Sequence, residues 1–301
     1  MKLKVLSVAK TEKGTMDLPS QFHETIRPDV IYRAVLAIYS NKRQPYGTDP
    51  RAGKKSMAKL SRRRRNWKGS YGHGISRVPR KIVSRSGTQF NWIGAFAPMT
   101  VGGMRAHPPK SWKSWKMKVN KKENRKAIRS AMAATLSKEL VKSKGHEVPE
   151  NYPFIIESKI EKISKTAELV DTLKKLGFEN ELERATRKIR AGMGKARGRK
   201  YKTTRGMLIV VSQPCELQNA AENLTGVEVA EIKKINAEIL APGASAGRMT
   251  IFTESAIEML AKEKLFTGEI KIKKEEKPEI KKQEEPKAIA KPKPKVKVAK
   301  K

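Results

Sequence analysis

A glycine-rich motif containing serine is the first feature of this sequence that could support enzyme chemistry. In Gly243-Ala244-Ser245-Ala246-Gly247 the serine stands between two glycines, the spacing that holds a nucleophilic serine on a turn between strand and helix in many hydrolases. That chemistry also requires a histidine later in the chain, but the last histidine is His146. The strand-like segment RMTIF follows the motif where a helix would be needed, so we interpret it as a loop of small residues.

A second glycine-rich segment, GMGKARGRK, superficially resembles a loop that binds nucleotide phosphates. A phosphate loop requires glycine, four residues and then Gly-Lys-Ser/Thr, whereas Arg197 is the fifth residue after Gly192. The segment also precedes its strand instead of following one. We therefore expect no nucleotide site and no cofactor here.

Histidine and cysteine offer no metal site either. The four histidines, His23, His73, His107 and His146, lack a short metal-ligand spacing. Cys215 is the only cysteine, so neither an intrachain disulfide nor a multi-cysteine zinc site can form. The residue types thus predict no catalytic, metal or cofactor site, and a protein that is not an enzyme.

Charge is the most informative property of the sequence. Lys and Arg number 67 against 30 Asp and Glu, a net charge of +37, which indicates a polyanionic partner. Residues 42–118 contain 20 basic residues and one acid, residues 184–205 ten and none, and residues 269–301 thirteen and six. The rest of the chain has 24 basic and 23 acidic residues. A nearly neutral body with concentrated cationic segments is expected of a protein that reaches into folded nucleic acid.

Residues 45–117 are predicted to form an extended RNA-binding arm. From residue 42 to 117 the chain has nine Gly, six Pro and all four Trp, with no sustained helical or strand period. Arginine can bridge phosphate oxygens, aromatic rings can stack on splayed bases, and glycine lets the backbone approach closely. The expected RNA contacts in the arm and in tract 184–205 are Arg43, Arg51, Lys54, Lys55, Arg62, Arg63, Arg64, Arg65, Trp67, Lys68, Tyr71, His73, Arg77, Arg80, Lys81, Arg85, Trp92, Arg105, His107, Trp112, Trp115, Arg190, Lys195, Arg197, Arg199 and Lys200.

Apolar periodicity predicts the elements that must position these residues. Strands and helices alternate, which favours a three-layer α/β domain with a mainly parallel sheet. That domain comprises residues 1–44 and 118–267, and residues 268–301 form a flexible Lys/Glu/Pro-rich tail. Strands are expected at 2–8, 153–157, 207–211, 226–230 and 248–252, and helices near 28–41, 120–145, 165–176, 180–190, 215–223 and 254–263.

No part of the sequence indicates a membrane protein. No stretch approaches the roughly 18 consecutive apolar residues of a transmembrane span, and the first residues, MKLKVLSVAK, lack the features of a secretory signal. We expect a soluble, cytoplasmic protein.

Three long motifs resemble a known family. YGTDPRAGKKSMAKLSRRRRNWKGSYGHG, FAPMTVGGMRAHPPK and GMGKARGRKYKTTRGMLIVV are similar to the universal large-subunit ribosomal protein four family, in its archaeal and eukaryotic branch. The similarity extends over nearly everything from Val5 to Leu265. It implies a structural constituent of the large ribosomal subunit that supports its assembly, with a globular α/β domain on the outer side and an arm threading ribosomal RNA toward the peptide exit tunnel.

The resemblance also implies residue roles and partners. The arm tip near the tunnel wall would comprise Trp67, Lys68, Gly69, Ser70 and Tyr71, close to the nascent peptide. The partners would be large-subunit ribosomal RNA and neighbouring ribosomal proteins. The returning limb would include Gly102, Gly103, Arg105, His107 and Pro108, and a second RNA-contact tract Arg197, Arg199 and Lys200.

Two other functions are compatible with a basic α/β protein. One is an RNA-modifying or nucleotide-using enzyme with a basic substrate arm, which the missing catalytic constellation disfavours. The other is a ribosome-independent RNA chaperone that binds through disordered basic segments. For the ribosomal protein, we expect the arm to be disordered until RNA supplies the anionic surface that orders it.

Overall fold

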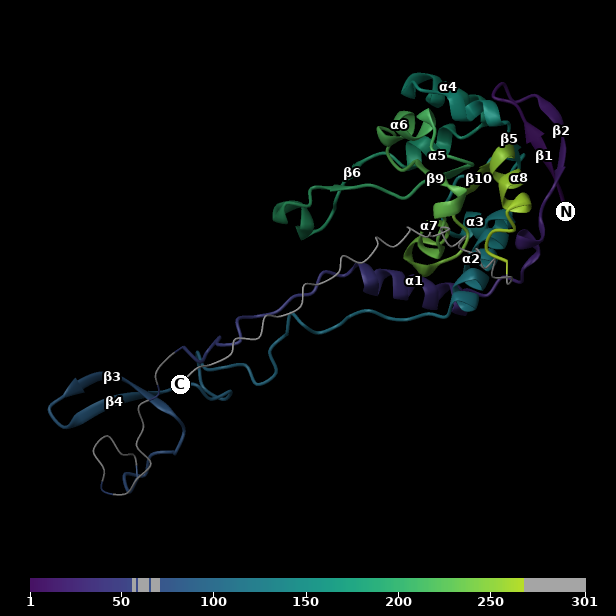
Figure 1. Ribbon diagram of the computed structural model, residues 1–301. Coiled ribbons are helices and arrows are strands. Elements are labelled where there is room, and N and C mark those ends of the chain that lie inside the picture. Colours follow the sequence, from purple (N-terminus) through teal and green to yellow (C-terminus); the bar gives the residue numbers. More distant parts are fainter. Residues whose placement is uncertain (56–57, 59–64, 66–70, 268–301) are drawn as a thin grey trace, which may run out of the picture. The chain divides into compact units, whose positions relative to one another are not determined.

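One six-stranded sheet organises the α/β domain. The computed structural model describes residues 1–55, 58, 65 and 71–267 (Figure 1). The strand order is β2-β1-β5-β10-β8-β9; β1 and β2 are antiparallel, and the other neighbouring pairs are parallel. A mainly parallel sheet is therefore confirmed. The strands are β1 (Lys2–Leu6), β2 (Glu12–Asp17), β5 (Ile155–Ile156), β8 (Leu208–Val211), β9 (Glu228–Glu231) and β10 (Thr250–Thr253).

Helices cover both faces of this sheet, giving the predicted three layers. Because side chains alternate along a strand, Leu208 and Val210 enter one hydrophobic cluster while Ile209 and Val211 enter the other. The first cluster includes residues of α1 (Pro28–Lys42), α2 (Lys121–Leu136), α7 (Ala237–Leu240) and α8 (Glu254–Lys262). The second includes residues of α3 (Lys138–Ser143), α4 (Thr166–Leu176), α5 (Glu179–Arg184) and α6 (Glu216–Glu222).

Two helices with a clear apolar stripe, α1 and α4, begin and end within one residue of the predicted positions. Pro28 is the first residue of α1, where the missing N–H of proline costs no helical hydrogen bond. Gly177 ends α4 with a φ of 96° and donates its N–H to the carbonyl of Leu173, a left-handed conformation that glycine adopts without a steric penalty.

Several predicted boundaries in the domain are wrong. β2 was not among the expected strands, because it is a largely exposed edge strand without an apolar period. The helix expected at 120–145 is divided into α2 and α3 because Ser137 has extended backbone angles. The helix expected at 180–190 ends at Arg184, and α7 was not expected at all.

The arm also contains structure that was not predicted. β3 (Arg80–Ser86) and β4 (Gln89–Gly94) form an antiparallel hairpin, with Gly87 in the turn at a φ of 56°. The pairing shifts register between Ile82 and Ser84, and such a shift conceals the two-residue period by which a strand is recognised.

Both glycine-rich motifs lie in loops. Residues 243–247 connect a short 3-10 turn, η5 (Pro242–Ala244), to β10, so a strand follows the serine as the sequence indicated. GMGKARGRK contains another turn, η3 (Met193–Arg197), between two short strands, β6 (Lys188–Ile189) and β7 (Tyr201–Lys202). The remaining 3-10 turns are η1 (Ser20–His23), η2 (Ser158–Lys162) and η4 (Ile232–Lys234).

Glu161 connects the carboxyl ends of two central strands. Its carboxylate accepts hydrogen bonds from the Ser212 N–H (3.2 Å) after β8 and from the Thr253 hydroxyl (2.7 Å) at the end of β10. The Ser255 hydroxyl in the first turn of α8 donates a third, at 2.6 Å. These contacts hold α8 against the sheet, so the carboxylate oxygens of Glu161 have a structural role.

Candidate nucleic-acid interface

The base of the arm is held by a stack of side chains next to α1. The Arg43 guanidinium carbon lies 3.8 Å from the ring centre of Trp115, and Tyr46 stacks on the same indole at 5.9 Å with an interplanar angle of 13°. Lys113 Nζ lies 4.5 Å from the Trp115 ring, and the Ser40 hydroxyl donates to the Trp115 carbonyl. The stack joins the outgoing limb of the arm to the returning limb.

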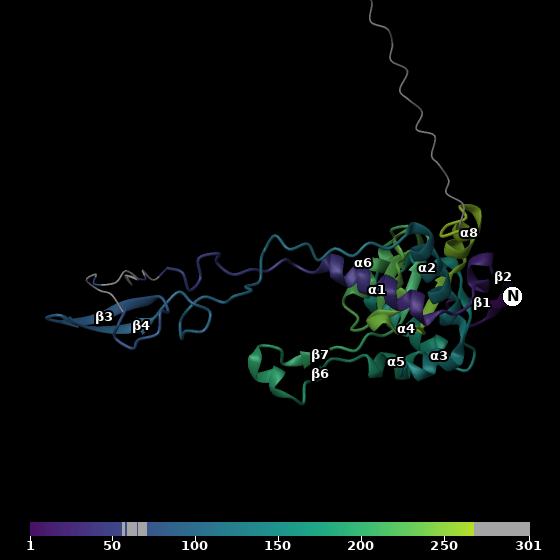
Figure 2. The same cartoon turned by 90° about the horizontal axis from the view of Figure 1, so that it is seen from below.

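Farther along, the two limbs remain in contact, as Figures 1 and 2 show. The Thr48 N–H donates to the Pro109 carbonyl at 3.2 Å. Gly53 has a φ of 70°, and a Cβ at this position would be 2.4 Å from the Gly103 carbonyl oxygen. Only glycine can provide both this backbone conformation and this approach.

The hairpin of β3 and β4 carries rings and cations on a narrow scaffold. Phe90 and Trp92 lie 6.0 Å apart between ring centres, and the Arg85 guanidinium carbon lies 5.7 Å from the Phe90 ring centre. Phe90 and Trp92 are half-buried, whereas Val83 and Ile93 are exposed. The hairpin therefore exposes apolar as well as cationic side chains.

The second basic tract is a smaller hairpin built on β6 and β7. Tyr201 lies at its centre, with the Arg187 guanidinium carbon 3.7 Å and Lys200 Nζ 5.5 Å from its ring centre. Arg190 donates its backbone N–H to the Lys200 carbonyl and its Nε–H to the Tyr201 carbonyl. These contacts organise a dense group of cations with no acid in the tract.

Two ion-pair clusters hold the ends of this tract on the domain. At its start, Arg184 donates to both carboxylate oxygens of buried Glu181 at 2.7 Å and to the Arg205 carbonyl at 3.0 Å. At its end, Arg205 pairs with Glu228 at 2.6 Å, and the fully buried Arg248 also pairs with Glu228 and donates to the Gly206 carbonyl. The first and last cations of tract 184–205 therefore serve the fold.

Buried Glu181 is charged because its partners outweigh its burial. Burial alone would raise the pKa of this carboxyl, but hydrogen bonds from Arg184 and His146 and the backbone N–H of Glu147 bring the pKa below its ordinary value. His146 Nδ1 lies 2.7 Å from Glu181 Oε1. His146 thus has a structural partner, which accounts for its burial in the core.

Most of the predicted RNA-contacting residues that the structure describes are exposed. Arg80, Trp92 and Trp115 are half-buried, and within the described part of the chain the indole Nε1 atoms of both tryptophans are buried without a hydrogen-bond partner. Lys55 pairs with Asp49 at 2.7 Å. Arg62, Arg63, Arg64, Trp67, Lys68, Gly69 and Ser70 lie outside the described residues.

The sequence reasoning missed the side chains that organise these segments. Tyr46, Lys113, Arg187 and Tyr201 were not among the predicted contacts, yet each takes part in a cation and ring contact. An aromatic residue within a run of cations is the signal that could have identified Tyr46 and Tyr201.

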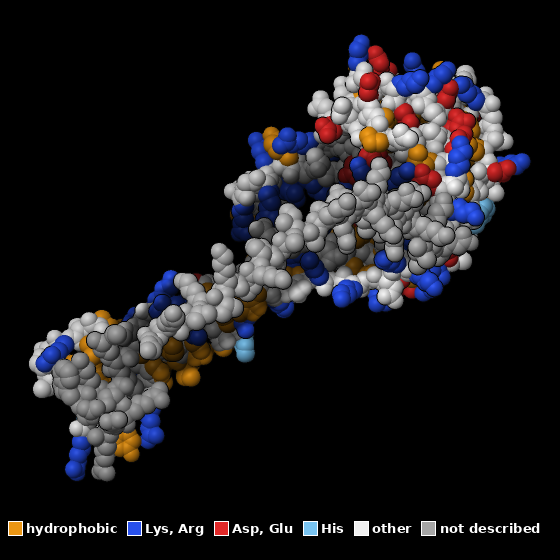
Figure 3. All heavy atoms as spheres, viewed as in Figure 1, with side chains coloured by type: hydrophobic (Ala, Val, Ile, Leu, Met, Phe, Trp, Pro, Cys, Tyr) orange, Lys and Arg blue, Asp and Glu red, His pale blue; other side chains and the backbone are white. Residues whose placement is uncertain are grey.

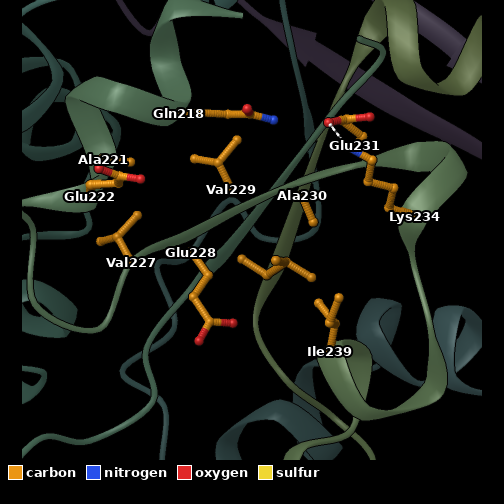
Figure 4. A pocket seen from close by; sticks show the side chains of 11 residues that line it. Gln218, Ala221, Glu222, Val227, Glu228, Val229, Ala230, Glu231, Lys234 and Ile239 are labelled. Carbon is orange, nitrogen blue, oxygen red and sulfur yellow. Dashed lines mark hydrogen bonds and ion pairs between the residues drawn. The ribbon is translucent and has the colours of Figure 1, made fainter. Parts of the chain in front are cut away.

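A hollow of about 510 Å³ at the outer edge of the sheet is the main alternative site. Figure 4 shows it beside β9, lined by side chains from α6, β9 and α7. Two of its carboxylates have partners, because Glu231 pairs with Lys234 and Glu228 with Arg205 and Arg248. Among the described residues its lining contains no histidine, cysteine, serine or threonine, so it offers neither a hydroxyl or thiol nucleophile nor a histidine base.

In residues 1–55, 58, 65 and 71–267 no three His, Cys, Asp or Glu side chains are placed to hold a metal ion. None of the helices found there is long and apolar enough to cross a membrane.

Comparison with known proteins shows the family to which this chain is related. Residues 16–263 match the model of the ribosomal protein L4/L1 family. "Large ribosomal subunit protein uL4" of Nanoarchaeum equitans is 47% identical over 88% of this chain and 100% of its own length. The proteins of the same name from Methanosphaera stadtmanae and Archaeoglobus fulgidus are 44% and 40% identical, each over 86% of this chain and 96% and 98% of their own lengths. These relatives are named as ribosomal proteins and not as enzymes, and the chain belongs to the ribosomal protein L4/L1 family.

Proposed function

We propose that this protein is a structural constituent of the large ribosomal subunit in the cytoplasm and that it binds large-subunit ribosomal RNA. The observation that carries the proposal is the division of charge: 24 basic and 23 acidic residues lie outside the arm, the second basic tract and the tail. In Figure 3 the red acidic side chains gather mainly over the α/β domain, while blue cations also follow the arm and the β6–β7 hairpin.

The exposed cations act by neutralising phosphates. Each Lys or Arg that contacts a phosphate releases counterions, so half a dozen contacts make affinity fall by about a thousandfold between 50 and 200 mM salt. Arginines such as Arg105 and Arg197 offer a planar fork that can bridge two phosphate oxygens. The neutral domain then serves as the folded body from which the two cationic segments extend.

The finer proposal concerns the direction and neighbours of the arm. The arm threads ribosomal RNA toward the exit tunnel, where its tip lies near the nascent peptide, and it supports assembly beside neighbouring ribosomal proteins. Of the tip residues 67–71, the structure describes Tyr71, which is 47% exposed and has the Arg77 guanidinium carbon 5.3 Å from its ring centre. An exposed ring with a cation on its face suits contact with RNA.

The test is incorporation into large subunits under a high-salt wash. We expect the wild-type chain to remain with washed subunits, whereas Lys188→Glu/Arg197→Glu/Arg199→Glu should be incorporated less and lost at lower salt. The matched control, Lys10→Glu/Lys142→Glu/Lys175→Glu, makes the same charge change at exposed positions of the domain and should behave like wild type.

Each rival function predicts a different result. A chaperone would be stripped from subunits by high salt, and an enzyme would convert a small-molecule or RNA substrate as the purified chain. Equal behaviour of the two triple variants would show that the second basic tract does not bind ribosomal RNA.

A further inference from the structure

A groove of about 580 Å³ lies at the base of the arm, between its two limbs. Its lining includes Tyr46, Arg105, His107, Lys110, Trp112 and Trp115, and none of the described residues that line it is acidic. Two indoles, a phenol ring and several cations are thus gathered around one hollow. A groove of this composition fits an anionic ligand that has a flat, unsaturated ring.

One wall of the groove is formed by contacts within the chain. The Trp115 ring is covered by Arg43 at 3.8 Å and Lys113 at 4.5 Å and stacks with Tyr46. The hydrogen bond from Thr48 N–H to the Pro109 carbonyl joins the limbs beside it. Trp115 therefore belongs to the scaffold of the groove.

Trp112 differs from the other described tryptophans. It is 68% exposed, whereas Trp92 and Trp115 are half-buried. Lys110 Nζ lies 5.5 Å from the Trp112 ring centre, and Arg105 and Lys113 also line the groove. An exposed indole surrounded by cations is a stacking surface for an unpaired base whose phosphates the cations can contact.

We propose that this groove binds one unstacked nucleotide of large-subunit ribosomal RNA. The base stacks on Trp112, and the flanking phosphates contact Arg105, Lys110 and Lys113. The inference rests on the proposed function and specifies where the arm captures a single nucleotide. An acidic peptide could satisfy the cations, but it would leave the flat Trp112 ring without a stacking partner, so RNA is the better match.

The first experiment is ultraviolet crosslinking of purified large subunits, followed by mass spectrometry of the peptide that contains Trp112. We expect a nucleotide adduct on this peptide. The second is chemical probing of the ribosomal RNA in subunits that carry Trp112→Ala, Trp112→Phe or the control Tyr32→Ala, which removes an exposed ring from α1.

Trp112→Ala should raise the reactivity of one nucleotide about fivefold or more, the low end for losing one base–aromatic stack. Trp112→Phe should restore most of the protection, and Tyr32→Ala should change nothing at that nucleotide. If the chain is in the subunits and forms adducts elsewhere but not on this peptide, or if Trp112→Ala exposes no nucleotide, the inference is wrong while the proposed function stands.

Two other outcomes would overturn the nucleotide site or the proposed function. Protein crosslinks from Lys110 or Lys113 to an acidic segment, without an RNA adduct, would overturn the nucleotide site in favour of a peptide site. Absence of the chain from washed subunits would overturn the proposed function itself.

Discussion

At the scale of single residues, Glu181 is a buried carboxylate whose charge stabilises the domain. Glu181→Gln keeps the size of the side chain but removes the charge that pairs with Arg184 and His146. We expect a loss of about 2 kcal/mol in the free energy of unfolding at pH 7, as is typical for hydrogen bonds to a buried charged group. Urea unfolding of the full chain would measure it.

The same residue predicts a pH dependence. The pKa of Glu181 is lower in the folded protein than the ordinary 4.5, so its stabilisation is complete above about pH 4.5 and is lost as pH falls through the folded-state pKa. Wild type should therefore lose stability in acid more steeply than Glu181→Gln. The control Glu168→Gln removes an exposed ion pair with Lys165 and should lower the free energy of unfolding by less than about 0.5 kcal/mol. If the stability of wild type and of Glu181→Gln fell in parallel with decreasing pH, the low pKa of Glu181 would be contradicted.

Among single residues, the exposed cations could be predicted from the sequence, but the role of Trp115 could not. The exposure of cations such as Arg105 and Lys195 could be predicted from composition. A segment that has few or no acidic residues offers no ion-pair partners with which its cations could be buried. The role of Trp115 was not evident, since its stack joins residues about 70 positions apart in the chain. A sequence reveals which side chains can stack, but contacts across the two limbs decide which ring remains free.

At the scale of elements, the ends of β8 and β10 depend on Glu161. Glu161→Ala would leave the N–H of Ser212 and the hydroxyls of Thr253 and Ser255 without their shared acceptor. We expect a loss of about 2–4 kcal/mol in the free energy of unfolding, since several hydrogen bonds to one charged group are removed. Urea denaturation would measure this loss. In the control Glu258→Ala, which removes an exposed ion pair with Lys262, we expect the free energy of unfolding to fall by less than about 0.5 kcal/mol. Equal losses in the two variants would argue against this role of Glu161.

The pairing of the two limbs depends on Gly53. In Gly53→Ala the new methyl would collide with the Gly103 carbonyl oxygen, so the limbs must separate. Gly102→Ala is the matched control, because Gly102 also has a φ of 70° but has open space around its Cβ position. In competition with tagged wild type, Gly53→Ala should enter fewer large subunits than Gly102→Ala. Equal incorporation would show that close contact between the limbs is dispensable.

Elements with strong apolar periodicity were predictable, and those defined by pairing were not. α1, α4 and β8 bury continuous stripes or runs, so their side chains specify them locally. β2 is an exposed edge strand, and the β3–β4 hairpin has a shifted register. Such strands form through backbone hydrogen bonds to a partner, which leave little trace in the pattern of side chains.

At the scale of the whole molecule, the separation of charge predicts how the free protein differs from the assembled one. The segment 45–117 carries many cations, and none of its described residues belongs to either hydrophobic cluster, so without RNA we expect a protease to cut it sooner than the α/β domain. Limited proteolysis with mass spectrometry should find early cuts between residues 45 and 117 in the free chain and protection of the same sites in large subunits. An arm that resists protease without RNA would contradict this.

The pairing of the arm's two limbs has a topological consequence. The arm leaves the domain after α1 and returns to it at α2, so both of its ends are covalently fixed and neither can lead the way through a narrow opening. A doubled strand needs a wider passage than a single one. Under the proposed threading, ribosomal RNA must therefore close around an arm that is already in place, so this protein would arrive before the RNA around the arm has closed.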